Sequence, residues 1–343
     1  MNKNKVNIGI LGAGKMAYWH LRAYSANSKC RILAIANPSS GRGEILARKF
    51  RVKSCFKNED ELLSLPGLDA VDISVPTGLH AGLICKALKK GLNVYVEKPM
   101  CRNMEEANRI VDLNKEARKI VFAGFNLRFC REFMRVKEVL DSGELGDVKF
   151  IVIKRGASVN PDSYIFNPDF NAGIITELSS HALDLLRWWG FKDVKQVYAE
   201  GTNVFKNHPR PDSVCLNLKY NSGASAVVIN SYAMPSISTE VEIMGSEKIL
   251  ILKYGKVIVQ KLPVMWSIPS MLWVTFKQSV IFPYRILYNP LAGACDHFVE
   301  CLCENKRSLI DENEGMENIR LAALLNESYI KGNAIETGNN FTK

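Results

Sequence analysis

The chain has 343 residues, of which 47% are hydrophobic and 23% are charged, with 45 Lys and Arg against 35 Asp and Glu. These proportions exclude a disordered, collagen-like or disulfide-scaffold protein, and the length is sufficient for two ordinary domains. The net charge of +10 is concentrated, because residues 248–295 contain six Lys and Arg but no Asp or Glu. Such an excess indicates nucleic acid, an anionic membrane surface or an anionic substrate as a partner.

The nine cysteines form no Cys-x-x-Cys pair, and most of them lie in apolar stretches, as reduced buried thiols do. Their spacing offers no structural zinc site, and we expect no metal. Lys3 and Lys5 precede an apolar run that Lys15 interrupts, and no signal-peptide cleavage site follows. No apolar run reaches the about 18–20 residues of a membrane span. These observations predict a cytoplasmic protein.

The first 126 residues predict strands that alternate with helices. Expected strands cover residues 6–11, 31–36, 52–56, 69–75, 93–96 and 120–123. Expected helices cover residues 16–24, 43–50, 80–90 and 104–118. This alternation is typical of a parallel sheet that is covered by helices on both faces.

After residue 126 the pattern changes to strands that are joined mostly by turns. Expected strands cover residues 148–154, 194–200, 213–220, 224–231, 238–244 and 249–252, and helices cover 132–140, 181–189, 295–303 and 315–330. Turns such as Asn221-Ser222-Gly223 favour antiparallel pairing. We therefore predict an α/β protein with two domains. Residues 1–125 form a doubly wound Rossmann domain, and residues 126–343 form an α+β domain with an open, largely antiparallel sheet.

A glycine-rich motif connects the first expected strand to the first expected helix. Gly12-Ala13-Gly14-Lys15-Met16-Ala17 fits the pattern G-x-G-x-x-G/A. The first glycine permits a tight turn, the second lets the backbone approach a pyrophosphate, and Ala17 packs the helix on the strand. The pyrophosphate lies on the N–H groups at the positive end of the helix. We therefore expect Gly12, Gly14, Lys15, Met16 and Ala17 to bind a dinucleotide cofactor.

Asn37 ends the second expected strand, where NAD-binding proteins usually place an Asp or Glu that holds the ribose 2′-hydroxyl. Without that carboxylate, a 2′-phosphate meets no repulsion, and Ser39, Ser40 and Arg42 can bond to it. This segment favours NADP(H) over NAD(H). The alternative, in which Arg42 is a solvated residue at a helix start and the protein uses either cofactor, stays open.

Two further motifs follow expected strands of the same sheet. Glu97-Lys98-Pro99 comes after the strand over residues 93–96, and Pro76-Thr77-Gly78-Leu79-His80 comes after the strand over residues 69–75. In a doubly wound sheet, the carboxyl ends of the strands face the cofactor crevice. A lysine at this position can reach both the nicotinamide and a substrate hydroxyl. Pro76, Thr77 and Glu97 are further candidates for cofactor contact, and we expect His80 to cap a helix beside the cofactor.

Together these motifs resemble the Gfo/Idh/MocA family (glucose-fructose oxidoreductase, inositol 2-dehydrogenase and rhizopine catabolism). The resemblance covers nearly the whole chain and rests on residues 12–14, 76–80, 97–99, 124–129 and 173–184. It implies an N-terminal Rossmann domain, a C-terminal α/β domain and an NAD(P)-dependent oxidoreductase of sugars, sugar nucleotides or cyclitols. It also implies a homo-oligomer, a dimer or tetramer that associates through the C-terminal sheet.

The resemblance further implies that Lys98 and His181 are the catalytic pair, with Glu177 at a position that is usually Asp. The physical argument agrees, because imidazole titrates near working pH and can accept the hydroxyl proton. The Lys98 ammonium would stabilise the developing alkoxide. On a helix Glu177 and His181 are i and i+4 neighbours, so we expect the carboxylate to orient or charge the ring. Arg128 and Asp184 are the candidates for substrate contact.

Residues 262–290 are rich in aromatic side chains, with Lys277 and Arg285 as their only charges. We expect them to cover the sheet or to form a subunit interface. Peripheral contact with an anionic membrane is the alternative, whereas no recognition motif supports nucleic acid.

The sequence therefore predicts a cytoplasmic NAD(P)-dependent oxidoreductase that transfers a hydride between the nicotinamide and a carbinol or ketone carbon of a sugar. A nucleotide sugar or another sugar derivative is the expected substrate. Two alternatives stay open: a catalytically silent NAD(P)-binding sensor or scaffold, and a membrane-surface oxidoreductase of a lipid-linked sugar.

Overall fold

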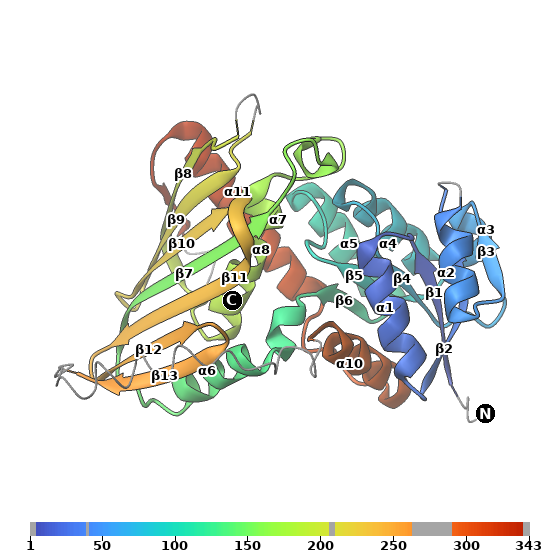
Figure 1. The fold of residues 1–343 in the computed structure, drawn as a ribbon, viewed down its shortest axis with the longest axis horizontal. Helices are drawn as coiled ribbons and strands as arrows, with labels where there is room; N and C mark the ends of the chain where they lie inside the picture. Colours follow the sequence, from blue (N-terminus) through green and yellow to red (C-terminus); the bar gives the residue numbers. More distant parts are fainter. Residues whose placement is uncertain (1–4, 39–40, 206–209, 263–289, 339–343) are drawn as a thin grey trace.

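A six-stranded sheet and an eight-stranded sheet form the two halves of the molecule (Figure 1). The structure is a computed structural model and describes residues 5–38, 41–205, 210–262 and 290–338. Ser39, a predicted cofactor contact, and residues 263–289 of the basic aromatic stretch lie outside this range.

The N-terminal sheet is entirely parallel, with the strand order β3-β2-β1-β4-β5-β6. Its strands are β1 (Val6–Leu11), β2 (Cys30–Ala36), β3 (Ser54–Phe56), β4 (Ala70–Ile73), β5 (Asn93–Glu97) and β6 (Val121–Gly124). The connections contain α1 (Lys15–Ala26), α2 (Arg42–Phe50), α3 (Glu59–Leu63), η1 (Thr77–Leu79), α4 (His80–Lys89) and α5 (Met104–Ala117). Every residue of β1 and β4 is buried, because helices cover both faces of the sheet. The predicted doubly wound domain is confirmed.

The C-terminal sheet is mixed and mostly antiparallel, with the strand order β13-β12-β11-β7-β10-β9-β8-β14 and one parallel pair, β7 with β10. Its strands are β7 (Val148–Ser158), β8 (Val194–Thr202), β9 (Ser213–Tyr220), β10 (Ser225–Ser231), β11 (Ala233–Gly245), β12 (Lys248–Lys253), β13 (Lys256–Lys261) and β14 (Ile335–Glu336). The sequence did not predict β13, because its hairpin turns at Tyr254 and Gly255 rather than at a familiar Asn-Gly pair. Both residues have positive φ, as this type of turn requires.

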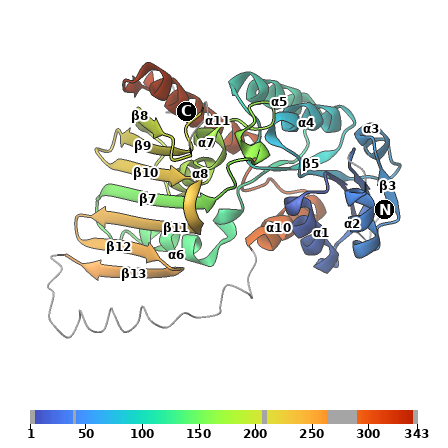
Figure 2. The same ribbon diagram turned by 45° about the horizontal axis from the view of Figure 1, so that its top comes forward.

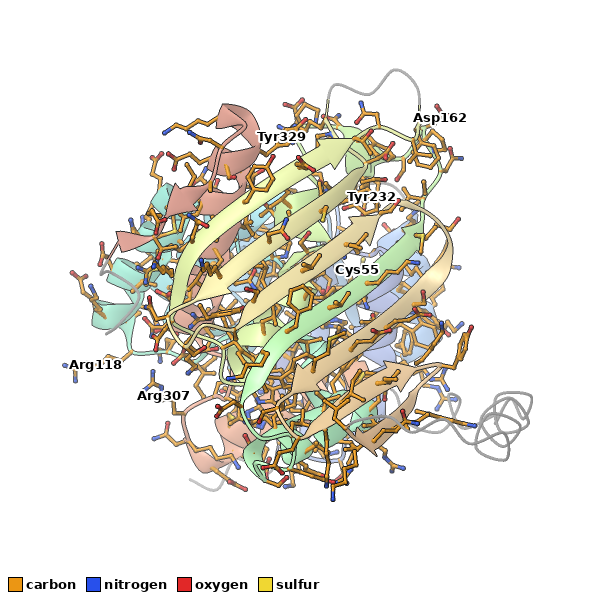
Figure 3. The ribbon with its side chains drawn as sticks, turned by 90° about the vertical axis from the view of Figure 1, so that its left-hand side faces the viewer. Cys55, Arg118, Asp162, Tyr232, Arg307 and Tyr329 are labelled. Carbon is orange, nitrogen blue, oxygen red and sulfur yellow. The ribbon has the colours of Figure 1, made fainter. Side chains whose placement is uncertain are left out.

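Helices cover the face of this sheet that looks toward the N-terminal half, whereas the opposite face is turned outward (Figure 3). The remaining elements are η2 (Asn126–Phe129), α6 (Arg131–Asp141), η3 (Tyr164–Phe166), α7 (Ile174–Glu177), α8 (Ser180–Trp188), α10 (Pro290–Glu304) and α11 (Glu312–Lys331). Within the described ranges, no helix has the length and apolar character that crossing a membrane requires.

The two halves have separate hydrophobic cores, and α10 belongs to the first of them. Leu291, Ala294, Cys295, Phe298 and Val299 on this helix pack with the strands and helices of the Rossmann sheet. The chain therefore returns to the N-terminal half after completing the eight-stranded sheet, and α10 lies beside α1 (Figure 1).

Candidate functional site

The loop between β1 and α1 has the backbone that a dinucleotide requires. Gly12 adopts a φ of 108°, and a Cβ at this position would lie 2.4 Å from the Ser74 carbonyl oxygen. Only glycine fits there, since an L side chain would be strained and would also clash. Gly14 is exposed and has open space where a Cβ would project. The cradle therefore has room for a phosphate group against the main chain.

The same loop leads into the N-terminus of α1, which favours an anion. Gly14 is the N-cap of α1 and provides no side-chain hydrogen bond, and the first turn carries no acidic residue. The N–H groups at this end and the helix dipole are thus available to a pyrophosphate. Lys15 is exposed at the same edge, Met16 is partly buried, and Ala17 is fully buried against the sheet. These features fit a dinucleotide in the predicted orientation.

Asn37 lies at the end of β2, where its N–H donates to the Phe56 carbonyl oxygen at 2.9 Å. Arg42 is exposed as the first residue of α2. Both residues therefore lie at the carboxyl edge of the sheet, on the side where an adenosine ribose would bind in this fold.

The loop after β4 contains Pro76 and Thr77 and packs against the Lys98 loop through His80. Nδ1 of His80 lies 2.8 Å from the Pro99 carbonyl oxygen, and Nε2 lies 2.9 Å from the Val75 carbonyl oxygen. The ring is completely buried at the start of α4. The ring therefore joins two loops. It does not cap the helix as the sequence predicted, because Leu79 is the N-cap of α4 and no side chain caps that end.

A buried charged cluster, which the sequence did not predict, lies below the cradle. His20 on α1 contacts Asp72 on β4 through Nδ1 at 2.6 Å and Glu97 on β5 through Nε2 at 2.8 Å. Tyr24 and Ser74 donate to the same Asp72 carboxylate, at 2.9 and 2.7 Å. Burial lowers the pKa of His20, but Asp72 and Glu97 outweigh it and raise this pKa to about 10. The Glu97 side chain thus binds His20 and holds the base of the Lys98 loop.

Lys98 reaches from the end of β5 to the C-terminal half. Its Nζ donates to the Glu177 carbonyl oxygen at 3.0 Å, so the two halves meet at the predicted catalytic lysine. Burial lowers the pKa of Lys98, Glu177 and Glu97 oppose this effect, and Arg155 adds to it. An ammonium in such a position stabilises negative charge more strongly than it would in water.

His181 lies near Lys98 at the start of α8 and is buried. Burial together with the positive charges of Arg155 and Lys98 lowers its pKa well below the usual value. The ring is therefore neutral at physiological pH, as a proton acceptor must be. Its Nδ1 is shut off from solvent and has no hydrogen-bond partner within the described residues.

Glu177 does not orient His181 as the sequence predicted. The helix is interrupted at Leu178 and Ser179, so Glu177 ends α7 while His181 belongs to α8. The Glu177 carboxylate instead accepts the Ala172 N–H at 3.0 Å. In this structure the Glu177 charge raises the pKa of Lys98, and the carboxylate forms no hydrogen bond with the His181 ring.

The prediction of substrate contacts from Arg128 and Asp184 is also corrected. The two side chains form a buried pair, with Nη2 of Arg128 2.6 Å from Oδ1 of Asp184, and the same nitrogen lies 2.6 Å from Oε2 of Glu314 on α11. Nη1 of Arg128 donates to the Leu309 carbonyl oxygen. These bonds satisfy both groups and join η2, α8 and α11.

Arg155 on β7 is a further charged group of this centre that the sequence analysis missed. It is close enough to lower the pKa of both Lys98 and His181. Burial lowers the pKa of Arg155 itself to about 10. Its position in the middle of a strand gave no sequence signal, because only the sheet register places it beside the catalytic pair.

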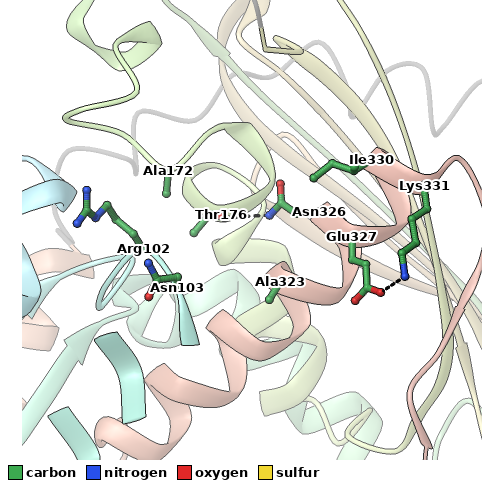
Figure 4. A pocket seen from close by; sticks show the side chains of 9 residues that line it. All are labelled: Arg102, Asn103, Ala172, Thr176, Ala323, Asn326, Glu327, Ile330 and Lys331. Atoms are coloured by element: carbon green, nitrogen blue, oxygen red, sulfur yellow. Dashed lines mark hydrogen bonds and ion pairs between the residues drawn. The ribbon is translucent and has the colours of Figure 1, made fainter. Parts of the chain in front are cut away.

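An open pocket of about 420 Å³ is lined by residues of α7, of α11 and of the segment before α5 (Figure 4). Its lining comes from both halves: Arg102, Asn103, Ala172, Thr176, Ala323, Asn326, Glu327, Ile330 and Lys331. The pocket contains neither Lys98 nor His181, so we regard it as a neighbour of the catalytic centre. Among the described residues, no group of three or more His, Cys, Asp or Glu is arranged to hold a metal ion.

Comparison with known proteins identifies the family. Residues 6–125 match the model of the Gfo/Idh/MocA oxidoreductase family with an NAD-binding Rossmann fold, and residues 133–251 match the model of its C-terminal domain. The chain belongs to this family.

Curated relatives and solved structures agree with that membership. The chain is 27% identical to a myo-inositol 2-dehydrogenase of Thermotoga maritima over 248 residues, which are 71% of this chain and 73% of that protein. It is 24% identical to the scyllo-inositol 2-dehydrogenase (NAD(+)) of Bacillus subtilis over 97% of both chains. The WlbA dehydrogenase of Bordetella pertussis, in complex with NADH and UDP-GlcNAcA, has a TM-score of 0.83 at 17% identity and covers 98% of this chain and 99% of that chain.

The predictions of the family, of an oxidoreductase and of a cofactor-binding Rossmann domain are thus confirmed. The family description names NAD.

Proposed function

We propose that this chain is an NAD(P)-dependent dehydrogenase that oxidises a secondary carbinol of a cyclic polyol or sugar derivative. The observation that carries the proposal is the meeting of Lys98 and a neutral, buried His181 at the crevice beyond the glycine cradle. Such a pair suits an alcohol, since one group accepts the hydroxyl proton and the other stabilises the alkoxide.

The mechanism follows from the charges of these residues. A bound nicotinamide cofactor supplies the hydride acceptor. The neutral imidazole of His181 takes the hydroxyl proton, and the Lys98 ammonium stabilises the oxygen as its charge develops. The hydrogen bond from Lys98 to the Glu177 carbonyl oxygen fixes the ammonium in place. His80 and Glu97 hold the surrounding loops in place through their hydrogen bonds to Pro99 and His20.

We propose a sugar derivative, with a nucleotide sugar as the first candidate, for the substrate. The relatives from Thermotoga maritima and Bacillus subtilis are named for inositols, and the WlbA structure contains UDP-GlcNAcA. Both kinds of molecule present a ring carbinol. Arg155, which has no carboxylate partner among the described residues and lies close enough to lower the pKa of Lys98, supports an anionic sugar derivative such as a nucleotide sugar.

We also propose that the chain prefers NADP(H) to NAD(H). Asn37 offers no carboxylate to repel a 2′-phosphate, and the exposed Arg42 can pair with one. The substitution Asn37→Asp should reverse the preference, because a carboxylate accepts the ribose 2′-hydroxyl and repels the phosphate. The check is the ratio of kcat/KM for the two cofactors, with Asn58→Asp at the start of α3 as a matched control. An unchanged ratio in Asn37→Asp would refute this preference.

The outward face of the C-terminal sheet is our candidate for association into a dimer or tetramer. It exposes Phe150 on β7, Ile229 on β10 and Ile258 on β13. A double substitution of Phe150 and Ile229 by Lys should yield monomers by light scattering. An unchanged molar mass would contradict the proposal.

The activity is tested by incubating the purified protein with NAD⁺ or NADP⁺ and a panel of inositols, sugars and nucleotide sugars. Reduced nicotinamide should appear with at least one of them. Lys98→Met and His181→Asn should each lower kcat by about 10²–10⁴-fold, whereas the exposed Lys89→Met serves as the matched control. Undiminished turnover in both catalytic variants would refute the mechanism. Cofactor binding without turnover on any substrate would favour the silent sensor.

A further inference from the structure

Arg155 is a charged residue on an otherwise apolar face of the sheet. Register places it beside Asn230 of β10 on one side and Thr239 of β11 on the other. The two preceding rows on the same face are apolar and buried: Ala226, Ile151 and Ile243 in one, and Val228, Ile153 and Val241 in the other. The polar row of Asn230, Arg155 and Thr239 thus interrupts the core, which continues beyond it with Ala157 and Tyr232. Figure 2 shows that β7 runs toward the N-terminal half.

No carboxylate of the protein balances this charge. Every aspartate and glutamate of the chain lies within the described residues, and none of them forms an ion pair with Arg155 there. The two buried arginines among the described residues of this half, Arg128 and Arg187, both contact carboxylates. A buried charge without a partner is costly, and proteins keep one where a ligand provides the partner.

The polar row also leaves hydrogen-bonding capacity unused. One nitrogen of Arg155, Nη1, donates to the Thr239 hydroxyl, while its Nε is buried without a partner. Asn230 donates to the Arg155 carbonyl oxygen at 3.1 Å, and its Oδ1 is likewise buried and unpartnered. Nδ1 of His181 is also buried without a hydrogen-bond partner among the described residues. One buried polar atom in each of Arg155, Asn230 and His181 therefore lacks a hydrogen-bond partner among the described residues. Most buried polar atoms in proteins have such a partner.

We propose that Arg155, Asn230 and Thr239 form a subsite for a carboxylate carried by the substrate, next to the carbon that is oxidised. The substrate is then a sugar acid, free or as part of a nucleotide sugar. One guanidinium balances one negative charge, which suits a carboxylate better than a dianionic phosphate. Its unused Nε and remaining N–H groups provide the fork that a carboxylate accepts. This inference rests on the proposed dehydrogenase activity and narrows its substrate class.

The experiment compares wild-type protein with Arg155→Met and Arg155→Lys on matched substrates. D-glucuronate carries the carboxylate, glucose lacks it, glucose 6-phosphate replaces it with a phosphate, and UDP-glucuronate adds the nucleotide. Arg155→Met should lower kcat/KM for the acids by roughly 100-fold, as truncation of one partner of a buried charge pair does. The loss for glucose, which has no carboxylate to pair with Arg155, should be at least about tenfold smaller than the loss for the acids, and Arg155→Lys should recover part of the loss for the acids. Binding of the same probes to the NADH-loaded protein, measured by calorimetry, gives a readout that does not depend on turnover.

A stability measurement separates recognition from a structural role. Arg155→Met removes an unpaired charge, so its thermal midpoint should equal or exceed that of wild type. Arg128→Met breaks the paired cluster and should lower the midpoint, which makes it the matched control. A comparable fall in Arg155→Met would overturn the proposal.

The remaining outcomes are also distinguishable. If the wild-type protein oxidises neutral polyols and binds no acid, the subsite is refuted while the dehydrogenase proposal stands. Preference for glucose 6-phosphate over glucuronate would refute the carboxylate. If acids bind through Arg155 but nothing is oxidised, the dehydrogenase proposal fails and the subsite remains.

Discussion

The buried cluster around His20 makes a quantitative prediction about stability. His20→Asn removes the cation between Asp72 and Glu97 and leaves two carboxylates inside the N-terminal core. Breaking a buried ion pair from one side costs about 3–5 kcal/mol. Tyr24 and Ser74 still donate to Asp72, so we expect a loss near the lower limit, about 3 kcal/mol.

The pH dependence gives an independent measure of the same interaction. The pKa of His20 is about 10 in the folded protein, whereas the ordinary value is 6.5. A raised pKa contributes stability that is fully present below pH 6.5 and is lost as the pH rises through about 10. The shift corresponds to a few kcal/mol, the same order as the loss expected for His20→Asn, because one pKa unit is about 1.4 kcal/mol. The stability difference between wild type and His20→Asn should therefore shrink as the pH increases from 6.5 to 10.

Urea unfolding followed by circular dichroism at a series of pH values tests both expectations. Lys86→Ala is the matched control, since Lys86 contacts Glu59 and Asp60 at the surface with 44% of its side chain exposed. Exposed pairs contribute about 1 kcal/mol or less. If His20→Asn destabilises the protein no more than Lys86→Ala, or if the difference from wild type is the same at every pH, the reasoning is wrong.

Three further predictions concern the crevice and its supports. The acid limb of the kcat/KM profile should lie below pH 6.5, because the pKa of His181 is lowered. The alkaline limb should lie below pH 10.5, because the pKa of Lys98 is lowered, and Lys98→Met should abolish it. An acid limb above pH 7 would contradict this assignment. Gly14→Ala should weaken NADH binding at least about tenfold, because a Cβ there enters open space that the cofactor needs, whereas Gly82→Ala on α4 should leave NADH binding unchanged. Arg128→Met should cost about 3–5 kcal/mol in urea unfolding, and a loss below about 1 kcal/mol would show that the Asp184 and Glu314 contacts contribute little.

The sequence by itself determined the Rossmann half, the glycine loop after β1 and the position of Lys98 directly after β5. These features are local: each motif lies directly after a buried strand, and the carboxyl ends of parallel strands always meet at one edge. Gly12 illustrates this, since its motif predicted a backbone that only glycine adopts, and its φ of 108° confirms it.

Only the tertiary structure decided the partners of the buried charges. Helical spacing predicted that Glu177 orients His181, but a break after Glu177 turns its carboxylate to Ala172. Arg128 received Asp184 and Glu314 as partners, which lie 56 and 186 residues away along the chain. Such pairings depend on how two halves and a returning helix pack together, and no local pattern records that.

For the positive charge of the chain, too, the sequence established one part and the structure another. Composition revealed an excess of +10 and left nucleic acid, membrane and anionic substrate as explanations. Residues 263–289, which carry part of it, lie outside the described structure. What the fold added is Arg155, one cation that sheet register brings to the catalytic centre between Asn230 and Thr239. Register is set by long-range strand pairing, so only the folded sheet places this arginine between Asn230 and Thr239 without a carboxylate partner among the described residues.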